Sequence, residues 1–135
     1  MMRTNPDYTE LYSGDLTGAG VTTNKPALAP GLYKWGTGVQ FTGVVKFMGS
    51  STDIWILQIA NDLIVGDGAN IIIEGGALPE NIFWQVTGQN YVGMTAHVEG
   101  IFLSMINENM HLYLLYIACQ FWLVYYVAIY SVSLS

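Results

Sequence analysis

Charged side chains are scarce in this chain and make up only 10% of its 135 residues. Four of them are cations: Arg3 near the N-terminus and the scattered Lys25, Lys34 and Lys46. Proteins that bind nucleic acid neutralise phosphates with clustered cations, and this sequence has no such cluster. The net charge of −6 opposes the same interaction. We therefore expect no nucleic-acid partner.

Cysteine and histidine are almost missing as well. Cys119 is the only cysteine, which excludes a disulfide within the chain and any metal motif built on cysteine pairs. A lone cysteine in an apolar stretch is usually a small buried hydrophobe. The two histidines, His97 and His111, are too few for a zinc site, which takes three or four ligands. Because no phosphate-binding glycine motif occurs either, we expect neither a metal nor a cofactor.

Catalytic groups that would converge on one site are also hard to find. Asp53, Asp62 and Asp67 could suggest the carboxylate pair of a glycoside hydrolase. Asp53 and Asp62, however, stand at positions typical of turns, where Asp bonds its own backbone. His97 and Glu99 are two apart on an expected strand and share a face, which reads most simply as a polar pair on a solvated surface. We do not expect an enzyme.

Glycine and apolar residues are abundant instead. The 15 glycines and the 52% of hydrophobic residues fit an ordered domain with its own core rather than a disordered chain. Residues 1–30 are polar and rich in turn signals, such as Asn5-Pro6 and Gly18-Ala19-Gly20, which disfavour a long helix. The first residues lack the apolar stretch of a secretory signal, so we expect no cleavable signal peptide in this chain.

Residues 55–71 and 82–98 are two copies of one pattern, 27 positions apart without a gap. WILQIANDLIVGDGANI lies over IFWQVTGQNYVGMTAHV, and a period of roughly 20–50 residues is typical of stacked-coil architectures. Short apolar runs bounded by Gly, Asn and Asp extend from Leu28 to about Ser104 and are typical of strands. A shift of 24 adds a third coil, with Tyr33-Lys34-Trp35 under Leu57-Gln58-Ile59 and Phe47 under Ile71.

This pattern predicts a mainly β chain folded as an irregular β-solenoid, in which each coil buries its inward side chains on the coil below. Stacking places outward residues in rows about 4.7–4.9 Å apart. A flat, weakly charged face of this kind can order water, although an ordinary solvated sheet face has the same pattern. With Ala69, Ile71 and Ile73 inward, the expected outward residues are Asn70 and Ile72, with Thr95, His97 and Glu99 in the next coil and Lys46 in the row of Asn70.

The last segment differs in composition, because no Asp, Glu, Lys or Arg occurs from Asn109 to Ser135. Residues 112–130 are apolar except for Gln120 and the tyrosines, and three interpretations are open. The segment has the length of a membrane span, about 20 residues, but lacks flanking cations. It could also form a final strand or helix over the end of the solenoid, or be an altered C-terminus that folds poorly. We divide the chain into a partial solenoid domain, 1–104, and an atypical apolar tail, 105–135.

Five segments between Asn5 and Ser104 resemble the microbial ice-binding (antifreeze) protein family of fungi, bacteria and polar algae. The run GGALPENIFWQV, followed by TAHVEG, is the most specific of these matches, and the resemblance covers roughly three quarters of the chain. It implies an irregular right-handed β-solenoid of triangular section, a long helix along one side, and a flat face that adsorbs to ice. Family members are typically secreted and need no cofactor. The matching segments are NPDYTELYSGDL (5–16), LAPGLYKWGTGV (28–39), STDIWILQIANDL (51–63), GGALPENIFWQV (75–86) and VGMTAHVEGIFLS (92–104).

The chain departs from the family pattern in three places. It begins where the family's long helix would be ending, so we expect that flanking helix to be largely missing. After Ser104 the tail resembles nothing in the family, as a shifted reading frame or an alternative exon would produce. The loose ice-facing motif T-G/A-x-T/N is matched only in part by Asp67-Gly68-Ala69-Asn70 and Thr95-Ala96-His97-Val98, which are one residue out of register.

The resemblance implies an ice-binding protein, extracellular by analogy, whose partner is ice and its ordered water. Our candidate ice-binding residues are the outward polar side chains of Thr42, Asn70, Thr95 and His97. Lys46 would disturb ordered water near them, because an ammonium group is strongly hydrated. The alternative function is an ice-inactive structural or adhesive solenoid fragment, held at a membrane through residues 112–130. The sequence indicates no oligomeric state.

Overall fold

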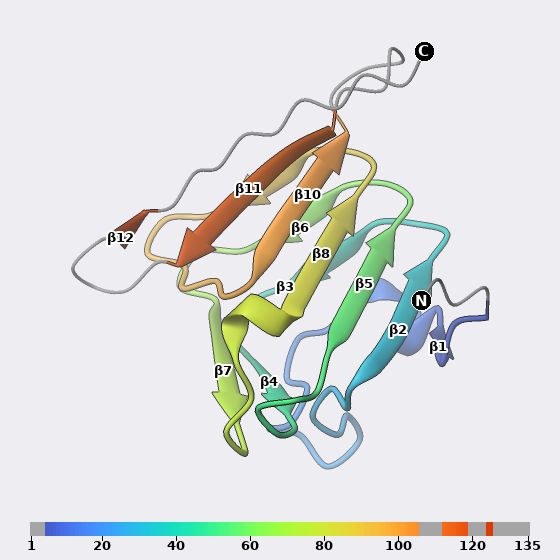
Figure 1. Cartoon of the computed structure of the whole chain (residues 1–135), viewed down its shortest axis with the longest axis vertical. Coiled ribbons are helices and arrows are strands. Elements are labelled where there is room, and N and C mark those ends of the chain that lie inside the picture. Colours follow the sequence, from blue (N-terminus) through green and yellow to red (C-terminus); the bar gives the residue numbers. More distant parts are fainter. Residues whose placement is uncertain (1–4, 106–111, 119–123, 126–135) are drawn as a thin grey trace.

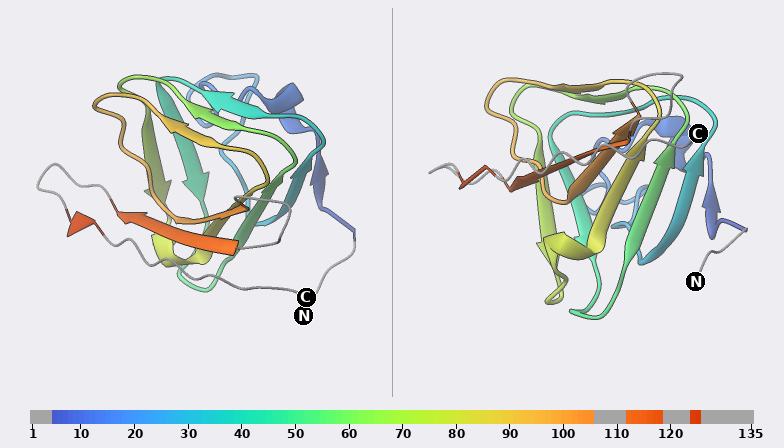
Figure 2. Two further views of the ribbon diagram at one scale, coloured as in Figure 1. Left: turned by 90° about the horizontal axis from the view of Figure 1, so that it is seen from above. Right: turned by 45° about the horizontal axis from the view of Figure 1, so that its top comes forward.

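The computed structural model describes residues 5–105, 112–118 and 124–125. They form a β-solenoid of about three turns, in which parallel strands stack coil on coil. Seen from above, the chain runs around three sides and encloses the core between them (Figure 2). The prediction of a mainly β, solenoid fold is confirmed.

Each side of the solenoid is one sheet (Figure 1). The largest sheet has the strand order β1-β2-β5-β8-β10-β11-β12, the second β3-β6-β9 and the third β4-β7. We call the outward surfaces of these three sheets face A, face B and face C. The strands are β1 (Tyr8–Thr9), β2 (Gly31–Trp35), β3 (Val39–Phe41), β4 (Val44–Met48), β5 (Trp55–Ile59), β6 (Leu63–Val65), β7 (Asn70–Glu74), β8 (Ile82–Val86), β9 (Asn90–Val92), β10 (Ile101–Met105), β11 (Leu112–Ala118) and β12 (Val124–Tyr125), with short 3-10 helices η1 (Leu11–Gly14) and η2 (Pro79–Asn81).

The 27-residue repeat sets the stacking of the second and third coils on all three sides. Trp55 pairs with Ile82 between β5 and β8, and Leu63 pairs with Asn90 between β6 and β9. On the third side an isolated bridge joins Asn70 to His97. Each of these pairs is 27 positions apart, so the repeat read from the sequence is the structural repeat.

The first coil follows the predicted shift of 24 on two sides only. Tyr33 lies under Leu57 as predicted, but Phe47 pairs with Ile73 and not with Ile71, so this part of the predicted register was wrong by two residues. The reason lies in the corners. Two residues, 42–43, separate β3 from β4, whereas four residues, 66–69, separate β6 from β7.

Residues 8–28, which the turn signals of the sequence do not assign to a coil, add a partial coil. β1 pairs with β2, and isolated bridges join Asp15 to Gln40 and Leu28 to Phe47. Leu28 is 1% exposed and closes the core from below. The segment was missed because its strand is only two residues long and has no apolar periodicity.

Three fully buried tryptophans tie the sheet of face A to the rest of the coils. Trp84 stacks on Phe102, with ring centroids 5.6 Å apart and an interplanar angle of 2°, and lies edge-on to Phe47 at 5.9 Å. Each indole N–H donates to a backbone carbonyl in another segment, which satisfies the one polar group that a buried tryptophan carries. The pairs are Trp35 to Leu11 at 2.9 Å, Trp55 to Leu28 at 3.0 Å and Trp84 to Glu99 at 3.1 Å.

Tyr33 makes the stability of this fold sensitive to alkaline pH. Burial, together with the nearby Tyr8 and Tyr12, raises the pKa of Tyr33 above its usual 10.0, and its hydroxyl donates to the Ala29 carbonyl at 2.6 Å. The folded state therefore keeps the phenol neutral where the unfolded chain ionises. This contribution to stability is complete below pH 10 and is lost above it, at up to about 1.4 kcal/mol per pH unit.

We expect Tyr33→Phe to unfold with a flatter pH dependence above pH 10 than the unmodified chain. Urea unfolding followed by tryptophan fluorescence between pH 8 and pH 11 measures the difference. Tyr91→Phe is the control, because that side chain is half exposed. Parallel profiles for Tyr33→Phe and the unmodified chain would contradict this assignment.

The tail begins as an extension of the sheet of face A. β11 pairs antiparallel with β10, and β12 pairs antiparallel with β11. The remaining residues of the predicted segment 112–130 lie outside the described residues. Within the part of the chain that the structure describes, no helix is long and apolar enough to cross a membrane.

Candidate functional site

Among the described residues, no group of three His, Cys, Asp or Glu side chains is placed to hold a metal ion. The candidate functional features are the three outward faces of the solenoid. They share one backbone architecture but differ in charge, side-chain size and exposure, and these differences indicate what each face can bind.

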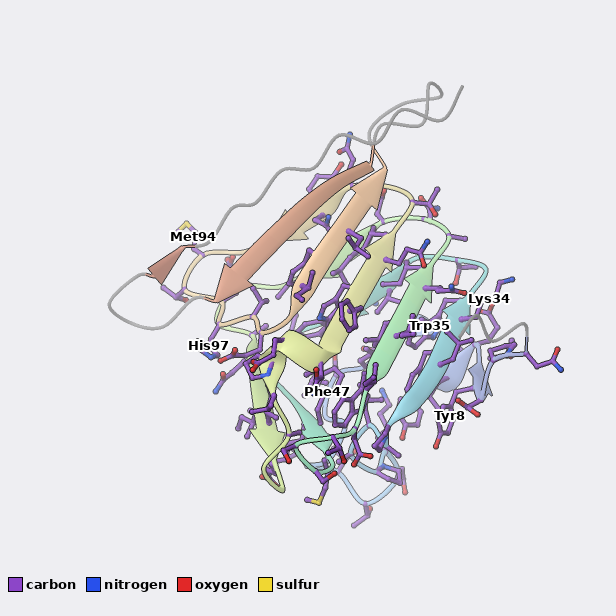
Figure 3. All side chains as sticks on the ribbon, in the orientation of Figure 1. Tyr8, Lys34, Trp35, Phe47, Met94 and His97 are labelled. Carbon is purple, nitrogen blue, oxygen red and sulfur yellow. The ribbon has the colours of Figure 1, made fainter. Side chains whose placement is uncertain are left out.

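Face C brings two of the predicted residues together. Asn70 opens β7, and His97 lies directly above it in the third coil. The Ile71 N–H donates to the His97 carbonyl at 2.9 Å, and the His97 N–H donates to the Ala69 carbonyl at 2.7 Å. Both side chains are partly buried. Figure 3 shows His97 far from Lys34 and Tyr8, which lie on the side of face A.

Face C also carries two side-chain pairs that include a carboxylate. The Lys46 ammonium lies 3.1 Å from the Glu74 carboxylate, and His97 Nε2 lies 2.8 Å from Glu99 Oε1. Lys46 pairs with Ile72 and not with Asn70, so the predicted row was wrong by one outward position, for the same two-residue difference in corner length. His97 and Glu99 do share a face, as predicted, and they bond each other there.

Thr42 and Thr95 lie at the corners between face B and face C. Thr42 directly follows β3 and is exposed, and its backbone N–H donates to Thr17 Oγ1 at 3.1 Å. Thr95 sits in the turn after β9 with a left-handed backbone, φ 59°, and its hydroxyl donates to the Met94 carbonyl at 2.6 Å. The two threonines belong to the first and third coils, so about two strand spacings, roughly 9–10 Å, separate their levels.

Face B presents an exposed row whose members in β3, β6 and β9 are uncharged. Gln40, Ile64 and Tyr91 are the central residues of β3, β6 and β9 and pair in register with one another. Ile64 is 47% exposed and Tyr91 is 50% exposed. Below Gln40 the row continues to Asp15, whose carboxylate lies 3.7 Å from the Lys25 ammonium. The neighbouring corner row begins with Thr42 and continues with Gly66, where a Cβ would collide with the Thr42 side chain. The three strands of face B therefore present uncharged outward groups, with Asp15 at the lower end of their row and Asp67 at the corner with face C.

Face A has a different character. Leu32, Ile56 and Phe83 form an outward apolar row along it, and Leu32 is only 5% exposed. Beside that row, Gln58 Nε2 donates to Gln85 Oε1 at 3.1 Å, with the exposed Lys34 below them in register. Bulky side chains and a cation make this face uneven.

The aspartates serve the solenoid frame. Asp53 accepts from the Ser50 N–H at 2.7 Å, within its own turn, as predicted. Asp62 instead accepts from the Gln89 N–H of the next coil at 2.8 Å, so the expectation that it bonds its own backbone was wrong.

The row on face B was not singled out from the sequence, although the signal was present. The shift of 24 takes Gln40 to Ile64, and the shift of 27 takes Ile64 to Tyr91. Candidates chosen for their polar side chains do not include an exposed isoleucine or tyrosine. The rows themselves could have been found from the repeat alone.

These features define a short β-solenoid whose candidate site is the outward surface of a sheet. A family model described as ice-binding-like matches residues 1–110, and the chain therefore belongs to that family. It is 40% identical over 108 residues to an ice-binding protein of Flavobacterium frigoris, covering 80% of this chain. It is 41% identical over 111 residues to one of Flammulina populicola, covering 79% of this chain.

The likeness extends to solved structures. An ice-binding protein from an Arctic yeast superposes with a TM-score of 0.70 at 36% identity, over 76% of this chain and 42% of that chain. The present chain spans only 37% of the Flavobacterium protein and 42% of the Flammulina protein. It thus corresponds to about two fifths of the length of these relatives.

Proposed function

We propose that this chain adsorbs to ice and slows the growth and recrystallisation of ice crystals, without catalysis and outside the cell. The relatives that share about 40% of its sequence are named ice-binding proteins. The observation that carries the proposal here is the row Gln40, Ile64 and Tyr91, which is exposed, in register and uncharged.

Adsorption needs a surface that holds water in an ordered layer and that has a small desolvation free energy. Uncharged groups of moderate size meet this condition, because an ammonium or carboxylate binds water strongly in its own geometry. The row Gln40, Ile64 and Tyr91 of face B meets it best, whereas the Lys46–Glu74 ion pair crosses face C. Stacking repeats the outward groups every 4.7–4.9 Å or so, which supplies the regularity.

We place the adsorbing surface on face B, with Thr42 and Thr95 along its corner with face C. Asn70 and His97, the other two candidates, lie on face C, where His97 is bonded to Glu99. They would contribute only if the ice surface reaches around the corner. Once bound, the protein blocks local growth of the crystal front between adsorbed molecules.

Thermal hysteresis and recrystallisation inhibition of the purified, folded chain test the proposal. We expect both effects to rise with protein concentration, and a heat-unfolded sample of equal concentration to lack them. Absence of both effects in concentrated folded protein would overturn the proposal and favour the ice-inactive structural fragment.

A further inference from the structure

Two aspartates stand on either side of β6 and hold β9 in place above it. Asp62 directly precedes β6, and its Oδ1 accepts from the Gln89 N–H at 2.8 Å. Asp67 follows β6, and its Oδ1 accepts from the Met94 N–H at 2.7 Å. Gln89 and Met94 flank β9 as the aspartates flank β6. The carboxylates therefore clamp both ends of one strand.

Glycines make room for these carboxylates. A Cβ added to Gly88 would collide with Asp62 Oδ1, and one added to Gly93 would collide with Asp67 Oδ1. An acidic side chain in one coil and a glycine in the next thus form a matched pair at each end of β9. The same pairing of an aspartate with a glycine of the next coil therefore occurs at both ends of β9.

The same device recurs at the other end of the molecule, around β1. Asp7 Oδ2 accepts from the Leu32 N–H at 2.8 Å, and Glu10 Oε1 accepts from the Gly36 N–H. A glycine again lies against each carboxylate, Gly31 beside Asp7 and Gly36 beside Glu10. β1 has two residues, and β6 and β9 have three each. The clamps occur where the strands are too short for their own ladder to fix the register.

We infer that Asp62 and Asp67 are positioning residues of the ice-adsorbing surface. They hold β9 level on β6 at both corners, so that Tyr91 and Ile64 stay in one plane on face B. This inference rests on the function proposed above. A functional surface generally tolerates displacements of only about 0.5 Å, and a strand of three residues has few ladder hydrogen bonds of its own to hold it in place.

Asp53 provides a matched control. Its Oδ2 accepts from the Ser50 N–H at 2.7 Å and from the Ser50 hydroxyl at 3.0 Å, all within one turn between β4 and β5. Removing this carboxylate breaks bonds of the same kind but leaves both corners of face B untouched. A purely structural role for Asp62 and Asp67 would give all three positions the same consequences.

The experiment compares Asp62→Ala/Asp67→Ala, Asp62→Asn/Asp67→Asn and Asp53→Ala in the full chain. Thermal hysteresis is measured where near-ultraviolet circular dichroism shows each variant folded, and amide exchange is followed at Gln89 and Met94. We expect the double alanine variant to lose about half of the hysteresis or more, with exchange at the two amides about tenfold faster. The asparagine variant keeps an acceptor oxygen and should retain both properties, as should Asp53→Ala.

Unchanged hysteresis in the double alanine variant, or an equal loss in Asp53→Ala, would overturn the inference. Should the double variant not fold, each single alanine variant is measured in its place. If the unmodified chain shows no hysteresis, the proposed function fails by itself. The exchange rates at Gln89 and Met94 then decide whether the carboxylates position β9, and unchanged rates would refute the clamp.

Discussion

Replacing Trp84 by alanine is expected to lower the free energy of unfolding by about 3–5 kcal/mol. Trp84 is 0% exposed and contacts aromatic rings from three other strands: Phe41, Phe47 and Phe102. Its removal leaves a cavity at the centre of the solenoid that short strands cannot close. Since domains are commonly stable by only about 5–15 kcal/mol, this loss removes a large share of the stability of the fold.

Urea unfolding monitored by far-ultraviolet circular dichroism measures this effect. Trp84→Phe is the control, because it keeps a large ring and loses chiefly the indole hydrogen bond to the Glu99 carbonyl, a loss of about 1 kcal/mol. If Trp84→Ala lowers the free energy of unfolding by less than about 1 kcal/mol, the aromatic cluster does not stabilise the core as argued.

The second large effect concerns activity. We expect Ile64→Lys to weaken binding to ice by about tenfold or more, because desolvating an ammonium group against ice costs more than the 1.4 kcal/mol that corresponds to a tenfold change in affinity. Thermal hysteresis should fall with the affinity. Ile64 is the central outward residue of face B and is 47% exposed. The substitution should leave the fold intact, since the new side chain points into solvent.

Ile72→Lys is the matched control. Ile72 is the central residue of β7 on face C, in the same coil, and its neighbours Lys46 and Glu74 are already charged. The same chemical change therefore falls on a different face. Equal losses of hysteresis in both variants would show that face B has no special role, and a loss confined to Ile72→Lys would move the site to face C.

The coil repeat shows how much of this fold could be predicted from sequence. The 27-residue match gave the stacking of the second coil on the third on every side, because both coils have corners of equal length. No single shift aligns the first coil with the second on all three sides, because the corner after β6 is two residues longer than the corner after β3. Corner length is a local choice that apolar periodicity does not encode.

The candidate site was predictable only in part, for a reason that concerns charge. Sequence reading picked Thr42, Asn70, Thr95 and His97 as outward polar groups, and the structure brings Asn70 and His97 side by side. It did not show that Lys46 reaches Glu74 across face C, because that pair joins two different rows. The distribution of charge over a face emerges only once all its rows are assembled.

Partition into ice tests the central claim most directly. Ice is grown slowly from equimolar mixtures of the unmodified chain with Ile64→Lys or with Ile72→Lys. Mass spectrometry, which separates the two chains by their molecular masses, then measures the amount of each in the ice and in the remaining liquid. If face B adsorbs to ice, the unmodified chain and Ile72→Lys will be enriched in the ice, while Ile64→Lys will stay in the liquid. Equal partition of Ile64→Lys and the unmodified chain would contradict the account.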